Sequence, residues 1–284
     1  MSALVAIVTC AGDDVDPDSP VLLAALRERG LDARVVVWND PLVNWGDFDL
    51  TVVRSTWDYA RSYSEFMQWA ASVPNLCNSL PSVRWSSDKH YLGDLAEAGV
   101  LTIATTFCQV GEVPSFPQSS FVVKPCIGAG SMDVERYEAD DSSAARAQVS
   151  ALHASGRDVI IQPYVRSVDE SGEVALVFID GEFAHAMRKG AMLNVTQLDR
   201  NDLFRREQMS LISVEPEVVA VGRAALAATG FSDLLYARVD LVADDDGWAI
   251  MEVELVEPSL FLTYSPDTVD RLALAILKRL DLRQ

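Results

Sequence analysis

The side chains best suited to chemistry lie in a hairpin-like stretch near the C-terminus, residues 235–255. If its turn falls in the middle, Asp240 lies opposite Glu252 and Arg238 lies opposite Glu254, and all four project from one face because side chains alternate along a strand. Clustered carboxylates repel one another unless a cation lies among them, and oxygen ligands on strands suit Mg²⁺. The alternative is an exposed polar face with an ordinary cross-strand Arg–Glu pair.

The other face of the same hairpin is apolar. Its arms, Leu235–Val242 and Trp248–Leu255, are joined by a turn centred on Asp245-Asp246. The residues expected on the packed face are Ala237, Val239, Leu241, Met251, Val253 and Leu255. The hairpin is therefore predicted to hold the polar cluster on a buried sheet.

A second candidate is a strand, Phe121–Lys124, that leads into a loop with glycines, Cys126–Ser131. Glycine lets backbone N–H groups approach a phosphate closely, and lysine adds a point charge. The order of the P-loop motif is absent, and an ordinary flexible turn is the alternative. Two weaker features flank this segment: Lys89, at the start of a predicted helix, and an apolar strand running into Gln162–Val165, whose free backbone groups could meet an adenine edge. A surface lysine and an inter-domain connector are their alternatives.

The elements expected to position these residues form two patterns. The first eighty residues alternate strand and helix: strands at Ala3–Thr9, Ala33–Val37 and Leu50–Val53, with a helix capped by Ser19-Pro20. This order predicts a small parallel sheet, and the polar stretch Asn75–Ser86 predicts a boundary. The rest of the chain predicts an α+β body containing a helix at Ser86–Ala98 and a hairpin at Asp180-Gly181, which is a strong turn signal.

Composition limits the partners. Of 284 residues, 23 are Lys or Arg and 42 are Asp or Glu, a formal net charge of −19, which disfavours nucleic acids and anionic membranes as partners. The sequence has no run of eighteen consecutive apolar residues, so no membrane span is predicted. The four cysteines lack CxxC spacing, which predicts reduced, buried thiols and a cytoplasmic protein. Lysine is scarce: apart from Lys278, only Lys89, Lys124 and Lys189 occur.

The order of these features resembles the ATP-grasp superfamily over roughly Ser86–Leu260. The resemblance implies an α/β protein with the ATP-grasp fold, preceded by an N-terminal α/β domain on the substrate side. The expected units are residues 1–85, a small ATP-grasp subdomain with the glycine loop at 86–162, and a C-terminal subdomain with the metal site at 163–284.

The resemblance also implies roles for individual residues. Lys89 and Lys124 would hold the phosphates of ATP under a mobile loop that contains Gly128, Gly130 and Ser131. The adenine contacts would be Gln162, Pro163, Tyr164 and Val165, with Asp169 or Glu173 near the ribose. Lys189 would contact phosphate and Arg238 would stabilise the transferring phosphoryl group, while Asp240, Glu252 and Glu254 would bind two Mg²⁺ ions. Glu254 is a departure, because most of the superfamily has asparagine there.

Three segments are similar to an actinobacterial branch of the superfamily that includes a ligase closing the ring of D-cycloserine from O-ureido-D-serine: Arg54–Tyr59, Gly181–Lys189 and Glu252–Leu260. The resemblance implies an antibiotic-biosynthesis ligase that forms a C–N bond through a phosphorylated intermediate. Intermolecular amino-acid or peptide ligation, a nucleotide-binding module without turnover and a kinase are the alternatives. A homodimer is one expected assembly.

Substrate contacts are expected in loops at the C-terminal ends of the first strands, where open sheets bind ligands. One is the run Thr9–Asp18 with four aspartates; the other contains Arg54, to pair with a carboxylate, with Thr56, Asp58 and Tyr59. Solvated or structural loops are the alternatives. His185 and Arg188 on a later strand complete the candidates.

Overall fold

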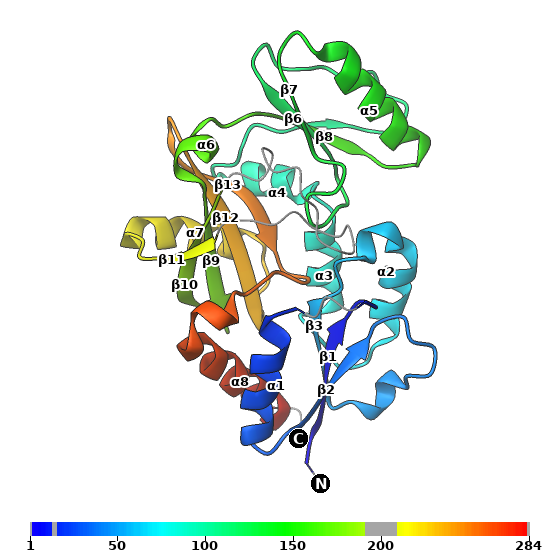
Figure 1. Ribbon diagram of the computed structural model, residues 1–284, viewed down its shortest axis with the longest axis vertical. Coiled ribbons are helices and arrows are strands. Elements are labelled where there is room, and N and C mark those ends of the chain that lie inside the picture. The colour runs from blue at the N-terminus through cyan, green and yellow to red at the C-terminus, as the bar shows by residue number, and fades with distance from the viewer. Residues whose placement is uncertain (1, 13–15, 191–208, 283–284) are drawn as a thin grey trace.

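The computed structural model describes residues 2–12, 16–190 and 209–282, which form three sheets and their covering helices (Figure 1). The N-terminal sheet has the order β2-β1-β3-β4 and is parallel throughout, as the sequence predicts. Its strands and helices are β1 (Leu4–Thr9), α1 (Asp18–Glu28), β2 (Asp32–Val37), β3 (Leu50–Ser55), α2 (Tyr63–Ser72) and β4 (Leu76–Cys77). Short 3₁₀ turns occupy Trp45–Asp47 and Tyr59–Arg61.

The start of α1 differs from the prediction. The helix begins at Asp18, so Ser19 is not its N-cap. Instead the Asp16 carboxylate accepts the backbone N–H of Asp18 at 3.1 Å and the Ser19 hydroxyl at 3.1 Å. Aspartate at the turn before a helix satisfies the free N–H groups as serine does, and the sequence offers both residues.

The predicted break at Asn75–Ser86 is wrong, because β4 and the helix α3 (Leu80–Ser87) occupy it. The predicted single helix Ser86–Ala98 is likewise two helices, α3 and α4 (Tyr91–Glu97). The serines that made α3 look like a loop are buried against β13: the Ser86 hydroxyl donates to the Val253 carbonyl at 2.9 Å and accepts the Leu255 N–H at 2.8 Å.

An antiparallel sheet of order β5-β8-β6-β7 forms the upper layer in Figure 1, with α5 on it. Its elements are β5 (Thr106–Cys108), β6 (Phe121–Pro125), β7 (Glu135–Tyr137), α5 (Ser142–Ala154) and β8 (Val159–Pro163). They pack mainly on one another. The predicted boundaries after residues 85 and 162 fall inside α3 and β8; the three-part division itself stays a prediction.

The central sheet has the order β11-β10-β9-β12-β13 and is antiparallel. Its elements are α6 (Ser167–Ser171), β9 (Glu173–Ile179), β10 (Glu182–Lys189), β11 (Met209–Ile212), α7 (Pro216–Ala228), β12 (Tyr236–Asp244) and β13 (Gly247–Glu254), followed by a 3₁₀ turn at Leu262–Tyr264 and α8 (Pro266–Asp281). The predicted Asp180-Gly181 turn joins β9 and β10, and both residues have positive φ, 51° and 79°.

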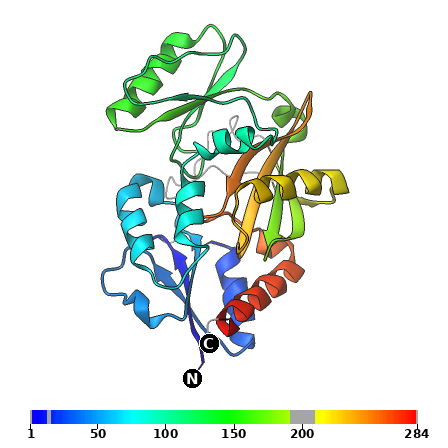
Figure 2. The same cartoon turned by 180° about the vertical axis from the view of Figure 1, so that it is seen from behind.

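The two faces of the central sheet have different neighbours. One face shares a hydrophobic core with α1, α8 and the N-terminal sheet, and the other packs against α7 and α4. Figure 2 shows α7 in front of the strands, with α8 and α1 side by side below them. In the described part of the chain, no helix is long and apolar enough to cross a membrane.

Candidate functional site

A cavity of about 720 Å³ lies where the three sheets meet. Its wall combines residues from the N-terminal sheet, the upper layer and the central sheet. The predicted site residues on this wall are Tyr59, Lys89, Lys124, Gly128, Gly130, Ser131, Gln162, Pro163, Tyr164, Val165, Glu173, Lys189, Arg238, Glu252 and Glu254. Segments far apart in the sequence therefore converge on one volume, large enough for a nucleotide and a small second substrate.

The carboxylate cluster has the predicted register. Asp240 pairs with Glu252 and Arg238 with Glu254, and carboxylate oxygens of the three acids lie within 4.8 Å of one another. A β-bulge follows: Leu241 pairs with Ile250, so Met251 is the extra residue. The prediction that Met251 faces the apolar side is wrong, because this side chain lines the cavity.

Buried cations hold the cluster together. Arg238 donates to both oxygens of Asp240, at 2.8 and 3.0 Å, and to Glu254 at 2.5 Å. Burial raises the pKa of Asp240, but Arg238 and Lys189 outweigh that effect and bring the pKa down to about 2. Burial raises the pKa of Glu254 to about 7, and repulsion from Glu252 and Asp240 adds to the rise against the opposing charge of Arg238.

The three cavity lysines differ in their partners. Lys89 Nζ lies 2.7 Å from the Glu252 carboxylate and donates to the Gly128 carbonyl at 3.0 Å. Lys189 Nζ donates to Asp240 at 2.9 Å and to Glu173 at 3.0 Å. Lys124 forms no ion pair within the described residues, and burial lowers its pKa. Among the described residues, Lys124 is thus the cavity lysine without an ion pair, and an anion bound in the cavity would supply one.

The glycine loop after β6 contains two consecutive residues with left-handed backbone. Gly130 and Ser131 both have positive φ, 63° and 60°. A Cβ at Gly128 would lie 3.2 Å from Pro125 Cγ, a close contact, which gives glycine a packing reason there. The loop lies over Lys89, whose ammonium contacts it, so the loop and the lysines bound one side of the cavity.

The predicted adenine segment, Gln162–Val165, follows β8 into the cavity wall. The Gln162 amide donates to the Thr105 hydroxyl at 2.8 Å, and the Tyr164 hydroxyl donates to Asp169 at 2.6 Å. Asp169 also accepts from Arg136 and is not part of the wall, whereas Glu173 is. Of the two ribose candidates, the structure brings only Glu173 to the cavity.

Five predicted substrate residues lie off the cavity wall. The Arg54 side chain is 1% exposed, donates to the Pro258 carbonyl at 2.7 Å and stacks over Tyr236. Thr56 is fully buried, and Asp58 accepts from Trp38 at 2.9 Å. The others are His185, which contacts Thr268 of α8, and Arg188, which is exposed on the far side of β10.

The wall also contains residues with no role in the sequence prediction. Trp57, Glu257 and several residues of 259–264 belong to it. Asp16 and Asp18 come from the aspartate run considered above, in which Asp13 and Asp14 lie outside the described residues. The sequence did contain a signal for Glu257 as a site residue, since it lies three residues after Glu254 in the segment Glu252–Leu260. The wall positions of 259–264 had none, because they depend on how the chain turns after β13.

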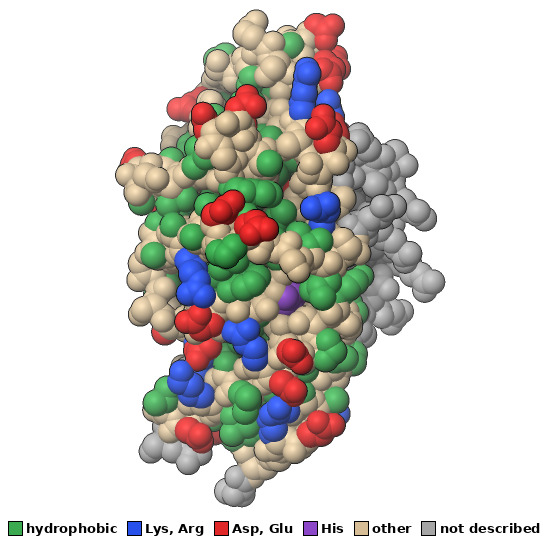
Figure 3. All heavy atoms as spheres, turned by 90° about the vertical axis from the view of Figure 1, so that its left-hand side faces the viewer, with side chains coloured by type: hydrophobic (Ala, Val, Ile, Leu, Met, Phe, Trp, Pro, Cys, Tyr) green, Lys and Arg blue, Asp and Glu red, His purple; other side chains and the backbone are tan. Residues whose placement is uncertain are grey.

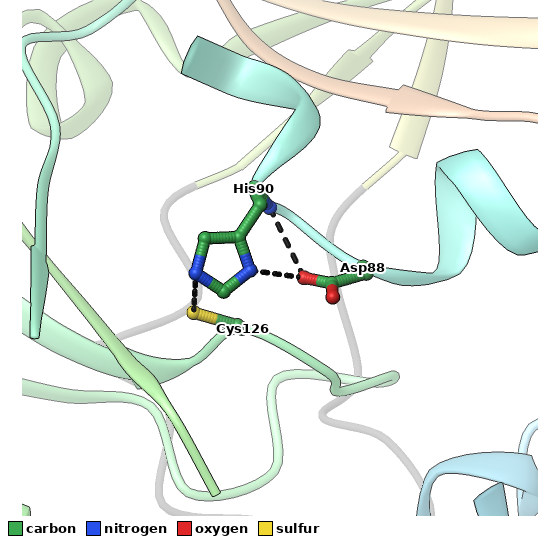
Figure 4. Close-up of side chains that lie close together, drawn as sticks. All are labelled: Asp88, His90 and Cys126. Atoms are coloured by element: carbon green, nitrogen blue, oxygen red, sulfur yellow. Dashed lines mark hydrogen bonds and ion pairs between the residues drawn. The ribbon is translucent and has the colours of Figure 1, made fainter. Parts of the chain in front are cut away.

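A polar cluster fixes the turn that carries Lys89 (Figure 4). The Asp88 carboxylate lies 2.6 Å from His90 Nδ1, and His90 Nε2 lies 3.8 Å from Cys126 Sγ. The Lys89 N–H donates to the Cys126 carbonyl at 2.9 Å. Burial raises the pKa of the Cys126 thiol, and all four cysteines are free and buried, as predicted. We interpret the cluster as the contact that holds the Lys89 turn against the start of the glycine loop.

Charged side chains of both signs are mixed on the face shown in Figure 3. Lys and Arg side chains alternate there with Asp and Glu, so the described part of this face offers no continuous basic surface. Nucleic acids bind to continuous basic patches.

Known proteins are similar to this chain in sequence and in structure. The family model for the N-terminal domain of D-cycloserine synthetase DcsG matches residues 5–80. The cycloserine biosynthesis protein DcsG of Streptomyces lavendulae is 39% identical over 305 residues, covering 99% of each chain. The chain belongs to the DcsG family. The crystal structure of D-cycloserine synthetase DcsG is similar with a TM-score of 0.87 and 38% identity, over 98% of this chain and 100% of that one.

More distant structures show the fold of this DcsG-family chain. D-alanine–D-alanine ligase from Bacillus anthracis complexed with ATP has a TM-score of 0.71 at 16% identity, over 99% of this chain and 98% of that one. The ATP-grasp ligase PsnB complexed with minimal precursor has a TM-score of 0.64 at 19% identity, over 98% and 100%. The predicted ATP-grasp fold is confirmed, and the chain is an ATP-dependent ligase that forms C–N bonds.

His185 gives this DcsG-family chain a measurable acid sensitivity. Burial lowers its pKa from 6.5 to about 4, so below pH 6.5 the unfolded chain takes up a proton that the folded chain does not. The free energy of unfolding should therefore fall between pH 7.5 and 5, by about 2 kcal/mol from this group. Urea unfolding of wild type and His185→Gln at both pH values measures the difference; equal losses in the two proteins would contradict it.

Proposed function

We propose that the protein uses Mg–ATP to activate the carboxylate of a small amino-acid-like substrate and closes it into a ring, converting O-ureido-D-serine to D-cycloserine. The main support for this proposal is that one cavity of a DcsG-family chain brings together the carboxylate cluster, three lysines and a substrate-side wall. The DcsG relative is named for cycloserine biosynthesis, and the shared family and fold support the same reaction here.

The cluster fits magnesium. Asp240, Glu252 and Glu254 offer hard oxygen donors on rigid strands, close enough together to share ions. We propose that these three hold two Mg²⁺ ions. When bound, Mg²⁺ neutralises charge on the β- and γ-phosphates of ATP.

The chain's own residues then have these roles. Lys89 and Lys124 bind phosphate oxygens beneath the loop that contains Gly128, Gly130 and Ser131. Lys189 and Arg238 approach the γ-phosphoryl group from the central sheet, where fixed positive charge stabilises the transfer. The Gln162–Val165 segment holds adenine and Glu173 contacts the ribose. The substrate carboxylate takes the phosphoryl group, and the ureido nitrogen of the substrate then displaces phosphate. Hydrolysis removes the carbamoyl group from that nitrogen as carbon dioxide and ammonia, which leaves D-cycloserine.

The substrate side consists of Tyr59, Trp57, Asp16 and Asp18, which line the same cavity as Glu252 and Glu254. This wall is crowded with acids, which favours a substrate bearing an ammonium group. Arg54 does not reach the wall and donates instead to the Pro258 carbonyl, so its role is to support the chain after β13.

The test is product analysis. Incubation with O-ureido-D-serine and Mg–ATP should release ADP, phosphate, ammonia and carbon dioxide, and mass spectrometry should detect D-cycloserine. ADP release only when a second amino acid is added would favour intermolecular ligation. A phosphorylated product that persists would indicate a kinase, and tight Mg–ATP binding without turnover on an amino-acid library would indicate a binding module.

We also propose a cytoplasmic location, since all four cysteines are free thiols. A homodimer is proposed as the assembly, and light scattering of the purified protein gives its mass directly.

A further inference from the structure

Six carboxyl side chains line the cavity, and five of them have partners. Glu173 bonds to Lys189, Glu252 to Lys89 and Glu254 to Arg238. Asp16 accepts from the Asp18 N–H and the Ser19 hydroxyl, while Asp18 accepts the backbone N–H groups of Leu260 and Leu262. The sixth is Glu257, whose carboxyl has no hydrogen bond or ion pair among the described residues.

Glu257 lies at the junction between the two halves of the cavity. It is only 8% exposed, and what is exposed faces the cavity wall. The backbone carbonyl of Glu257 accepts the indole N–H of Trp57 at 3.4 Å, which connects this residue to the substrate side. It also follows Glu254 by three residues, so it is next to the metal and phosphoryl side. A group in this position can reach a substrate that contacts both.

We propose that Glu257 is the general base that takes the proton from the attacking nitrogen during ring closure. In this step the nitrogen forms a bond to the acyl carbon, the bond from that carbon to the phosphate oxygen breaks, and phosphate leaves with the electron pair. The nitrogen's proton moves to the Glu257 carboxylate. The inference rests on the proposed function, because it assumes an acyl phosphate in this cavity.

The surroundings of Glu257 suit this task. A base is most available when both of its oxygens are unengaged, and each of the other five cavity carboxylates has at least one oxygen bound by a cation, a backbone N–H group or a hydroxyl. Burial raises the pKa of Glu257, and the charge of Glu254, with a smaller contribution from Glu252, adds to the rise. Lys89 and Arg238 oppose it, and the Tyr59 and Tyr236 hydroxyls are also titratable neighbours of Glu257. A raised pKa makes the carboxylate a stronger base toward the attacking nitrogen.

The experiment separates activation from ring closure. Glu257→Gln has the same shape but cannot accept the proton, and we expect the rate of cyclic product formation to fall about 10²- to 10⁴-fold. Hydroxylamine, a strong nucleophile in its neutral form, should still trap the acyl phosphate as a hydroxamate at a rate close to wild type. Glu257→Asp should restore part of the ring closure, and exposed Glu217→Gln on α7 should behave as wild type.

Each outcome is decisive. Ring closure at the wild-type rate in Glu257→Gln would overturn the proposal, and so would an equal loss of hydroxamate and cyclic product, which would mean that Glu257 serves binding or folding. A melting temperature within a few degrees of wild type shows that the variant is folded. If the wild-type protein gives neither hydroxamate nor cyclic product, the proposed function fails instead, and the role of Glu257 falls with it.

Discussion

Replacing Lys124 with methionine is expected to reduce ATP-dependent ligation about 10²- to 10³-fold, the loss typical of one electrostatic contact to a transition state. The same change should leave the free energy of unfolding unchanged or higher. Lys124 has no ion-pair partner among the described residues, so its ammonium loses hydration on folding without an internal anion to replace it. Methionine keeps the length of the side chain and removes that cost.

Steady-state kinetics in ATP and thermal melts measure the two effects of Lys124→Met. Lys189→Met is the informative contrast, because it leaves Glu173 and Asp240 without their shared cation and should lower the melting temperature. Lys278→Met, on the exposed surface of α8, is the control for loss of one lysine and should retain activity. A marked loss of stability in Lys124→Met would show that this lysine has a structural partner.

Asp240→Asn is expected to abolish ligation and to lower the free energy of unfolding by about 3–5 kcal/mol. Asp240 is 1% exposed and accepts hydrogen bonds from both Arg238 and Lys189. Without its charge, two buried cations lose their common counterion. Urea denaturation at neutral pH measures the change.

A second substitution tests the physical reason. Adding Lys189→Met to Asp240→Asn removes one of the two cations that lost a counterion and leaves Arg238 paired with Glu254, so the double variant should be more stable than Asp240→Asn alone, although still inactive. If the single variant unfolds at the same urea concentration as wild type, then Glu254 alone compensates Arg238 and the argument from Asp240 is wrong.

The register of the β12–β13 hairpin could be predicted because a turn of aspartates and a glycine fixes which residues lie opposite one another. The bulge could not, because one extra residue at Met251 leaves the pattern of polar and apolar residues almost intact while turning this side chain to the other face. Residues of regular strands near the turn were thus predictable, whereas the position of the irregularity depends on tertiary packing.

The substrate side was less predictable for a related reason. Arg54, Thr56 and Asp58 lie at the end of a strand where ligands commonly bind, yet β3 is covered by the central sheet and its polar side chains point into the protein. Helix α3 was hidden because its polar residues look like a loop in a sequence, although Ser86 is buried and satisfied by strand backbone. The contacts of Arg54 and Ser86 join residues 204 and 167 positions apart.

Asn78 connects the two lower sheets. Its amide donates to the carbonyls of Tyr236 and Leu255, and its side-chain oxygen accepts the Leu235 N–H, so one side chain joins the end of β4 to β12 and β13. The upper layer lacks so dense a connection and packs mainly on itself. One buried amide thus couples the N-terminal sheet to the central sheet that carries the carboxylate cluster, so a substitution at Asn78 should disturb the cluster from the far side of the sheet without touching the cavity wall.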